Sequence, residues 1–156
     1  VAIKTNGTLW TWGRNTQGQL GLSSAVYSSS SPAQVGALTT WLTVACGGYQ
    51  VITVKTDGTL WAWGLNAQGQ LGLNNTTNYS SPKQVSSLTT WSKIIGGTTH
   101  TIATKTDGTL WSWGDNADGQ LGQGNTTGLS SPKQVGALTT WYALGGGYSN
   151  TIALKY

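Results

Sequence analysis

The chain has 156 residues, a length typical of one domain, and carries 23 Gly, 9 Trp and a net charge of +4, with no Phe and no Met. Charged residues make up 8% of the chain, too few for a charged disordered polymer, and no apolar run approaches the roughly 20 residues of a membrane helix, so we expect no membrane contact. The single Cys46 and single His100 exclude an internal disulfide, and the sequence predicts neither a metal site nor a cofactor.

A repeat organises the sequence. The segment Thr-Asn-Gly-Thr-Leu-Trp-Thr-Trp-Gly at 5–13 returns with few changes at 56–64 and at 106–114. We therefore expect one repeat domain over residues 1–156, with units at 1–50, 51–100 and 101–150. Residues 151–156 open a fourth unit, because 152–155 copy the first four residues of the chain.

The third unit shows the expected elements in chain order. Residues 102–105 alternate apolar and polar side chains, Asp107-Gly108 is the signature of a tight hairpin, and 109–113 form a strand with both Trp side chains on one face. Two shorter strands follow at 132–135 and 141–144, separated by a turn at 136–140. Four strands per unit and no helical period predict an all-β fold.

Two all-β architectures use units of this size. A β-trefoil closes with three units, which suits the length, whereas a β-propeller uses one four-stranded blade per unit and needs about four to eight of them. The two ends of the chain copy the same strand, and a closed trefoil has no place for the second copy. We therefore predict four-stranded antiparallel propeller blades, three repeats forming an open segment of a ring, with the β-trefoil as the second choice.

The run Gly-Thr-Leu-Trp-x-Trp-Gly-x-Asn-x-x-Gly-Gln-Leu-Gly stands at 7–21, 58–72 and 108–122, and it resembles the regulator of chromosome condensation repeat. This resemblance implies a propeller, usually seven-bladed in that family, with complete blades near 32–63 and 82–113. A hairpin at 1–12 and three strands at 132–155 would then be complementary ends. The expected partners are the rest of a longer repeat array or other copies of the chain.

Most of the recurring side chains predict structural roles. The paired tryptophans could be stacking platforms for sugars or bases, but their recurrence in every unit favours packing between blades. The asparagine of the Gly-x-Asn-x-x-Gly loop could contact a ligand, but an amide that ties the turn is favoured. These structural residues are Trp10, Trp12, Trp61, Trp63, Trp111, Trp113, Asn15, Asn66 and Asn116.

No constellation of residues predicts catalysis. His100 has Gln50 and Asn150 as its repeat equivalents, and no nucleophile or carboxylate recurs beside it, so we expect no catalytic residue and no enzyme. Asp115 and Asp118 miss the spacing of a calcium loop.

Basic residues are few and scattered, so nucleic acid is not an expected partner. Four lysines do occupy the same place in successive units, and we expect them to form a solvated rim. They are Lys4, Lys55, Lys105 and Lys155.

Binding is expected where the units differ, because repeat scaffolds carry function in their variable segments. The variable segments are 22–31, 73–81, 123–131 and the residues that follow each Trp-Gly pair. Tyr and Arg are effective interface anchors. The candidate binding residues, for an unknown protein or glycan ligand, are Arg14, Tyr27, Tyr49, Leu65, Tyr79, Asp115 and Tyr148.

The composition, poor in charge and rich in Thr and Ser, favours a non-enzymatic scaffold or binding module for another macromolecule in a secreted, cell-surface or virus-particle setting. The family resemblance implies guanine-nucleotide exchange or chromatin binding as the first alternative. Short loops and the lack of a basic tail count against that alternative. A sugar-binding lectin and a secreted protein inhibitor remain open.

Overall fold

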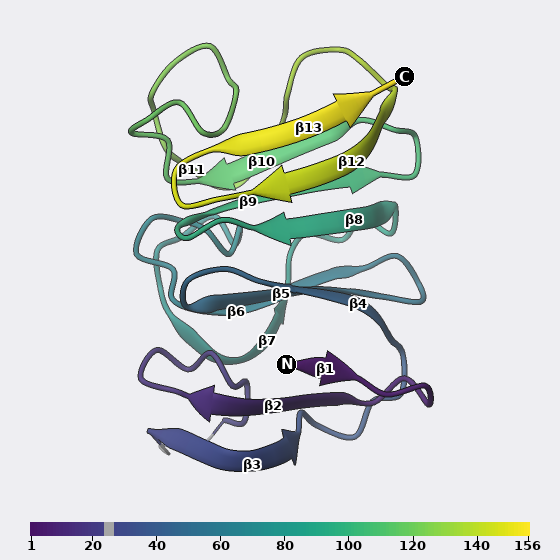
Figure 1. Cartoon of the computed structure of the whole chain (residues 1–156), viewed down its shortest axis with the longest axis vertical. Helices are drawn as coiled ribbons and strands as arrows, with labels where there is room; N and C mark the ends of the chain where they lie inside the picture. The colour runs from purple at the N-terminus through teal and green to yellow at the C-terminus, as the bar shows by residue number, and fades with distance from the viewer. Residues whose placement is uncertain (24–26) are drawn as a thin grey trace.

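The computed structural model describes residues 1–23 and 27–156, which form four antiparallel sheets arranged one after another along the long axis (Figure 1). The first sheet contains β1 (Ala2–Ile3), β2 (Leu9–Arg14) and β3 (Ser28–Gln34). The second contains β4 (Trp41–Cys46), β5 (Gln50–Lys55), β6 (Leu60–Gly64) and β7 (Tyr79–Gln84). The third contains β8 (Trp91–Gly96), β9 (His100–Lys105), β10 (Leu110–Gly114) and β11 (Leu129–Gln134), and the last contains β12 (Trp141–Gly146) and β13 (Thr151–Lys155).

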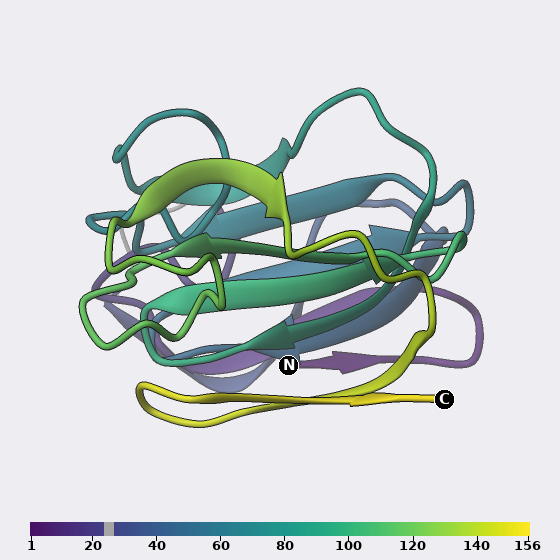
Figure 2. The same ribbon diagram turned by 90° about the horizontal axis from the view of Figure 1, so that it is seen from above.

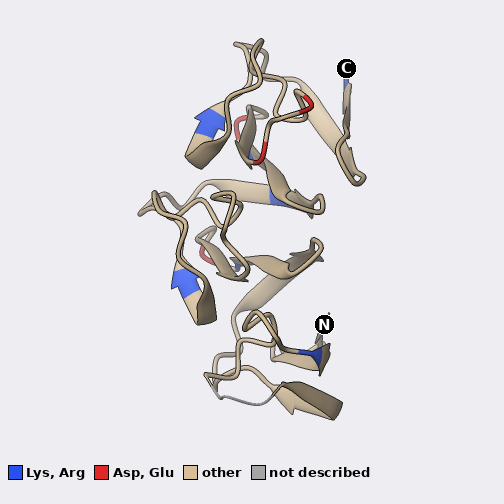
Figure 3. Ribbon diagram, turned by 90° about the vertical axis from the view of Figure 1, so that its left-hand side faces the viewer, with Lys and Arg blue, Asp and Glu red and all other residues tan. Residues whose placement is uncertain are grey.

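The predicted all-β fold of four-stranded antiparallel sheets in an open segment is confirmed. Figures 1 and 3 show the first and last sheets at opposite ends of the row, so the β-trefoil alternative is wrong. Seen from above, successive sheets overlie one another (Figure 2). Within the described residues no helix is long and apolar enough to cross a membrane.

The expected blade boundaries were wrong. The strand that contains Pro82 pairs with the Trp strand before it, in the register Trp61↔Gln84, so it closes its own sheet instead of opening the next. The complete sheets therefore run over 41–84 and 91–134, not 32–63 and 82–113. Three strands stand at the start of the chain and two at its end. The variable segment 22–31 includes residues 24–26, which lie outside the described residues.

The hairpins β1–β2, β5–β6 and β9–β10 each turn at an Asn-Gly or Asp-Gly pair. In the second sheet the Gly58 amide donates to the Lys55 carbonyl at 2.9 Å, and Gly58 has a φ of +77°, which favours glycine. A Cβ built on Gly58 would lie 2.0 Å from the carbonyl oxygen of Thr89, in the segment that leads to the third sheet. The turn thus brings two successive sheets into backbone contact, and the Trp91 amide donates to the Gly58 carbonyl at 3.1 Å.

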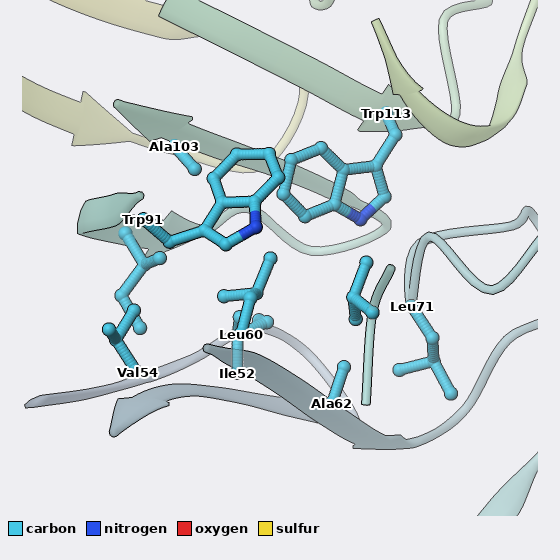
Figure 4. Close-up of a cluster of buried hydrophobic side chains, with 10 residues drawn as sticks. Ile52, Val54, Leu60, Ala62, Leu71, Trp91, Ala103 and Trp113 are labelled. Atoms are coloured by element: carbon cyan, nitrogen blue, oxygen red, sulfur yellow. The ribbon is translucent and has the colours of Figure 1, made fainter. Parts of the chain in front are cut away.

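The core lies between successive sheets. Trp91 and Trp113 of the third sheet point toward Leu60 of β6 and Leu71 of the connection between β6 and β7, and all four side chains are buried (Figure 4). Trp91 also makes edge contacts with both Trp111 and Trp113, at centroid distances of 5.9 and 5.8 Å. The indoles supply the apolar area that the missing Phe would otherwise provide.

Two of the four recurring lysines do not form a solvated rim. Lys55 is 8% exposed, and its Nζ lies 3.7 Å from the centroid of the Trp61 ring. Lys105 sits in the same way over Trp111, at 3.5 Å. Burial lowers the pKa of both ammonium groups, and Asp57 and Asp107 partly oppose that shift. The chain uses these lysines for cation–π packing on its indoles.

Candidate interaction rim

The residues predicted for binding gather at one end of the sheets. Strand register places the end of β6 beside the start of β5, with Gly64 opposite Gln50, and Gly114 lies opposite His100 in the third sheet. The turns at 46–50, 96–100 and 146–150 therefore share one edge with the residues that follow each Trp-Gly pair. We call this edge the interaction rim.

Arg14 and Tyr49 form a contact between the first two sheets on this rim. Arg14 Nη1 donates a hydrogen bond to the Tyr49 hydroxyl at 3.4 Å. The guanidinium carbon of Arg14 lies 5.4 Å from the centroid of the Tyr49 ring. Arg14 also donates from Nε to the Thr16 hydroxyl at 3.0 Å. Both side chains border a cavity of about 160 Å³ together with Trp12 and Gln50. Exposed Arg and Tyr in contact are suited to hold a protein surface.

The equivalents of Arg14 continue the rim in the next two sheets. Leu65 is half-buried, and its amide donates to the Tyr49 carbonyl at 2.9 Å. Asp115 is also half-buried, and its carboxylate accepts from the Thr99 hydroxyl at 3.2 Å and the Ala117 amide at 3.2 Å. A cationic, an apolar and an anionic side chain thus follow one another along the rim, a polarity that would orient a bound protein.

The three other candidate tyrosines, Tyr27, Tyr79 and Tyr148, differ in how exposed they are. Tyr148, in the turn between β12 and β13, is 78% exposed, and Tyr27 is 80% exposed. Tyr79 is half-buried and packs against the buried side chains on either side of the second sheet, both those shared with the first sheet and those shared with the third. Its hydroxyl accepts from Asn75 Nδ2 at 3.3 Å. The fold therefore uses Tyr79 to fill the space between sheets, which leaves less of this candidate binding residue available to a partner than of Tyr27 or Tyr148.

In the second and third sheets, the second Trp of each pair packs between successive sheets. Trp63 and Trp113 are fully buried, and their Nε1 atoms donate to the carbonyls of Gln19 and Gln70, each at 3.0 Å. The burial expected for Trp12 is not found, because it lies on the outward face of the first sheet and is 45% exposed.

The first Trp of each pair is held by its own turn. Trp61 Nε1 donates to the Thr59 hydroxyl at 2.9 Å, which donates to Asp57 Oδ1 at 2.6 Å. The same chain of bonds recurs in the other units, through Asn6 in the first and Asp107 in the third.

The loop asparagines fold their loops back on the sheet. Asn66 is fully buried, accepts from the Leu71 amide at 2.9 Å and donates to the Asn75 carbonyl at 2.9 Å. Asn116 accepts in the same way from the Leu121 amide, and Asn15 from the Leu20 amide.

The alternation of Gln50, His100 and Asn150 predicts a hydrogen-bonding residue within a blade, and the structure shows that at positions 50 and 100 this residue joins successive sheets. Gln50 Nε2 donates to the Gly97 carbonyl at 2.9 Å, across from the second sheet to the third. His100 is fully buried, and its Nε2 lies 3.2 Å from the Thr151 hydroxyl. That hydroxyl donates its one proton to the Gln120 carbonyl at 2.8 Å, so His100 Nε2 carries the proton of the imidazole.

Gln, His and Asn all have both donor and acceptor atoms, but the sequence does not indicate that the bond crosses to the next sheet. Burial lowers the pKa of His100, and Asp115 opposes that shift. In the part of the chain that the structure describes, no group of three or more His, Cys, Asp or Glu could hold a metal ion.

Repeated four-stranded antiparallel sheets, wedged apart by indoles and arranged as an open segment, define a partial β-propeller. The model of the regulator of chromosome condensation (RCC1) repeat matches residues 6–54, 57–104 and 107–154. The chain therefore belongs to the RCC1 repeat family, and its propeller sector is a binding module of that family.

Relatives of known name share these repeats. Human HERC3, named as a probable E3 ubiquitin-protein ligase, is 38% identical over 77 residues, which are 48% of this chain and 7% of HERC3. Mouse RCC2 is 39% identical over 80 residues, which are 50% of this chain and 15% of RCC2. The chain thus spans a small part of the relatives that it matches.

Two solved structures share the fold over 99% of this chain. Human WBSCR16 superposes with a TM-score of 0.88 at 22% identity, and the match covers 42% of that protein. Prp20p of Saccharomyces cerevisiae superposes with a TM-score of 0.88 at 18% identity, with 41% of it covered. Prp20p has binding properties toward Gsp1p and histones.

Proposed function

We propose that this chain is a non-catalytic, protein-binding sector of an RCC1-type propeller, and that its partner contacts the interaction rim. One observation carries the proposal: the structure gathers Arg14, Tyr49, Leu65 and Asp115 along one edge, where the backbone of the scaffold is fixed by sheet pairing. Rigid presentation of an Arg–Tyr contact limits the entropy lost on binding.

For the class of partner, the relatives support the exchange or chromatin alternative better than a secreted scaffold. Among the structural neighbours, Prp20p is a protein with binding properties toward Gsp1p and histones. The net charge of +4 is unfavourable for attraction to basic histones, so we place a Gsp1p-type partner first. The extracellular or virus-particle location expected from composition stays a prediction.

The proposal is tested by biolayer interferometry with immobilised Gsp1p and, separately, histones. Replacing a well-packed Arg or Tyr anchor costs at least about 2 kcal/mol, so Arg14→Ala and Tyr49→Ala should each weaken binding about 30-fold. Leu88→Ala is the matched control, since Leu88 is 43% exposed and lies in the connection between β7 and β8, outside the rim. Equal binding by all three variants would contradict the rim assignment.

A second measurement separates binding from exchange. If the chain accelerates release of a fluorescent guanine nucleotide from a small GTPase, and Arg14→Ala slows that release, the exchange alternative holds. Binding without acceleration would leave the chain as a binding module and remove exchange from the proposal.

A further inference from the structure

The tip of the β1–β2 hairpin carries an amide where the other two hairpins carry an acid. Asn6-Gly7 is the only Asn-Gly pair in the sequence, and its equivalents are Asp57-Gly58 and Asp107-Gly108. The side chains at all three tips are exposed. Because Asp57 and Asp107 stay exposed in the complete second and third sheets, the exposure of Asn6 does not depend on what precedes the first sheet.

An asparagine that precedes a glycine is open to an intramolecular reaction with its own backbone. The Gly7 nitrogen attacks Asn6 Cγ, the new C–N bond closes a five-membered succinimide, and Nδ2 leaves as ammonia with the proton of the Gly7 amide. Water then opens the ring. Cleavage at Cγ gives an aspartate with the normal backbone, and cleavage at the main-chain carbonyl gives an isoaspartate whose backbone runs through Cγ. Overall, one water is consumed and one ammonia is released.

Three features of the tip favour this reaction. Gly7 has no Cβ to block the approach of its nitrogen. Asn6 Oδ1 accepts from the Thr8 amide at 3.2 Å and from the Thr8 hydroxyl at 2.8 Å, and these donors polarise the carbonyl that is attacked. Asn6 Nδ2 makes no hydrogen bond to any described residue, so no bond retains it as it leaves. Asn66 and Asn116, by contrast, are fully buried and precede alanines.

One feature of the folded tip opposes the reaction. The Gly7 amide donates to the Lys4 carbonyl at 2.9 Å, and its nitrogen must give up this bond before it attacks. The next connection holds Gly7 in place, because the Trp41 amide donates to the Gly7 carbonyl at 3.2 Å and a Cβ on Gly7 would clash with the Thr39 carbonyl. The reaction therefore waits until the tip opens.

We propose that Asn6 is a site of spontaneous deamidation, at which water converts the amide to a carboxylate at a rate set by opening of the hairpin tip. The aspartate product is the residue that the other two units already use. Asp57 Oδ1 accepts from the Thr59 amide at 2.9 Å and the Thr59 hydroxyl at 2.6 Å, as Asn6 accepts from Thr8. The product therefore keeps the turn, and its added negative charge lowers the net charge of the chain from +4 to +3.

The isoaspartate product does not fit the folded tip. It lengthens the main chain by one carbon next to Gly7, whose position is fixed against the Thr39 carbonyl. Aspartate is therefore the product that the folded chain accommodates. The site lies at the edge opposite the interaction rim, since β5 runs from Gln50 on the rim to Lys55 at the equivalent tip, so the proposal is independent of the rim and its partner.

Peptide mapping by mass spectrometry tests the proposal on the purified chain, incubated at pH 8 either folded or unfolded in guanidinium chloride. We expect the exchange of an amide for a carboxyl at Asn6 in both samples, at least about tenfold more slowly in the folded chain. Tenfold corresponds to about 1.4 kcal/mol, the net strength of one backbone hydrogen bond. An unmodified Asn6 in the unfolded chain, or a folded chain that reacts as fast as the unfolded one, would overturn the proposal.

Two variants of the same turn provide matched controls. Asn6→Gln should stay unmodified, because its longer side chain would have to close a six-membered ring. Asp57→Asn/Asp107→Asn places Asn-Gly pairs in two turns of the same geometry, and both should deamidate with the same slowing on folding. Failure of both new pairs to react in the unfolded chain would contradict the chemistry assigned to Asn6.

The variant Asn6→Asp identifies the product. The main product of the folded chain should elute with this variant and melt at the same temperature as it. The isoaspartate form, isolated from the unfolded sample and refolded, should melt at a lower temperature. A folded chain that yields mainly isoaspartate would contradict the fit of the turn to aspartate.

Discussion

At the scale of single residues, the hydrogen-bonded chain that holds the first Trp of each pair ends on a carboxylate in two units and on an amide in the other. Asp57 and Asp107 accept from Thr59 and Thr109, and Asn6 accepts from Thr8 in the same geometry. The bonds from Thr59 and Thr109 lower the pKa of the two carboxyls from 3.8. An acid and an amide thus serve the same turn, but only the acid titrates.

We predict that this difference controls part of the acid unfolding of the protein. A carboxyl whose pKa is lowered by folding contributes stability above pH 3.8, and that contribution is lost as pH falls through the lowered folded value. The variant Asp57→Asn/Asp107→Asn keeps the Oδ1 acceptor, as Asn6 shows. Its unfolding free energy, followed by tryptophan fluorescence, should fall less steeply below pH 4 than that of the wild type. Parallel curves would contradict the assignment.

His100 should give a second pH dependence, at a higher pH. Burial holds its pKa below 6.5, so the unfolded chain binds a proton first and stability declines as pH falls from 6.5 toward the folded value. His100→Gln places the residue of the equivalent position, Gln50, which bonds to the next sheet without titrating. We expect melting temperatures that match the wild type at pH 8 and exceed it at pH 5. If the difference in melting temperature between the variant and the wild type were the same at pH 8 and at pH 5, the assigned role of His100 would be ruled out.

At the scale of the elements, the tight turns differ in how much they depend on glycine. Gly58 and Gly136 both have positive φ, +77° and +59°. A Cβ on Gly58 would stand 2.0 Å from the Thr89 carbonyl oxygen, whereas one on Gly136 has no described atom within 4 Å. Ser86 occupies the equivalent of Gly136 at φ +61°, so that turn accepts a side chain.

We predict that Gly58→Ser destabilises the fold by about 3 kcal/mol or more, because backbone strain and a clash with fixed backbone add together. Gly136→Ser, the matched control, should cost about 1 kcal/mol or less. Urea unfolding of both variants measures the difference. A loss at Gly58 no larger than that at Gly136 would show that the contact between the turn and the next sheet yields readily.

At the scale of the whole molecule, buried indole side chains stabilise the contacts between successive sheets. The same residue type in the same motif is fully buried at Trp63 and 45% exposed at Trp12, so the pair isolates the effect of a neighbouring sheet. The protein behaves as a row of units in which each interface counts separately.

We therefore predict that Trp63→Ala costs about 3–5 kcal/mol, the usual loss for a buried aromatic. Trp12→Ala should cost less than about 1 kcal/mol when both are measured in dilute, monomeric protein. Denaturant titration at low protein concentration provides the comparison. Equal losses would mean that Trp12 is buried in solution by part of the monomer itself.

Much of the architecture followed from the repeat, because the Asp-Gly turns, the Trp-x-Trp alternation and the spacing of about fifty residues are local signals. The blade boundaries did not. Pro82–Val85 carries no mark of which neighbour it pairs with, and the hydrogen bonds of β7 with β6 decide it. For the same reason, the sequence marks Tyr79 only as a variable aromatic residue, and its place between the cores on either side of the second sheet depends on the tertiary structure.

The sequence alone determined the all-β class, the repeat, the family resemblance and the set of residues at the variable positions, since each depends on residue type and spacing along the chain. Tertiary structure decided which variable residues share the interaction rim, that Lys55 lies on an indole, and that Trp12 is exposed where its equivalent Trp63 is buried. These facts depend on which surfaces meet across sheets, and contacts between segments fifty residues apart leave no trace in local pattern.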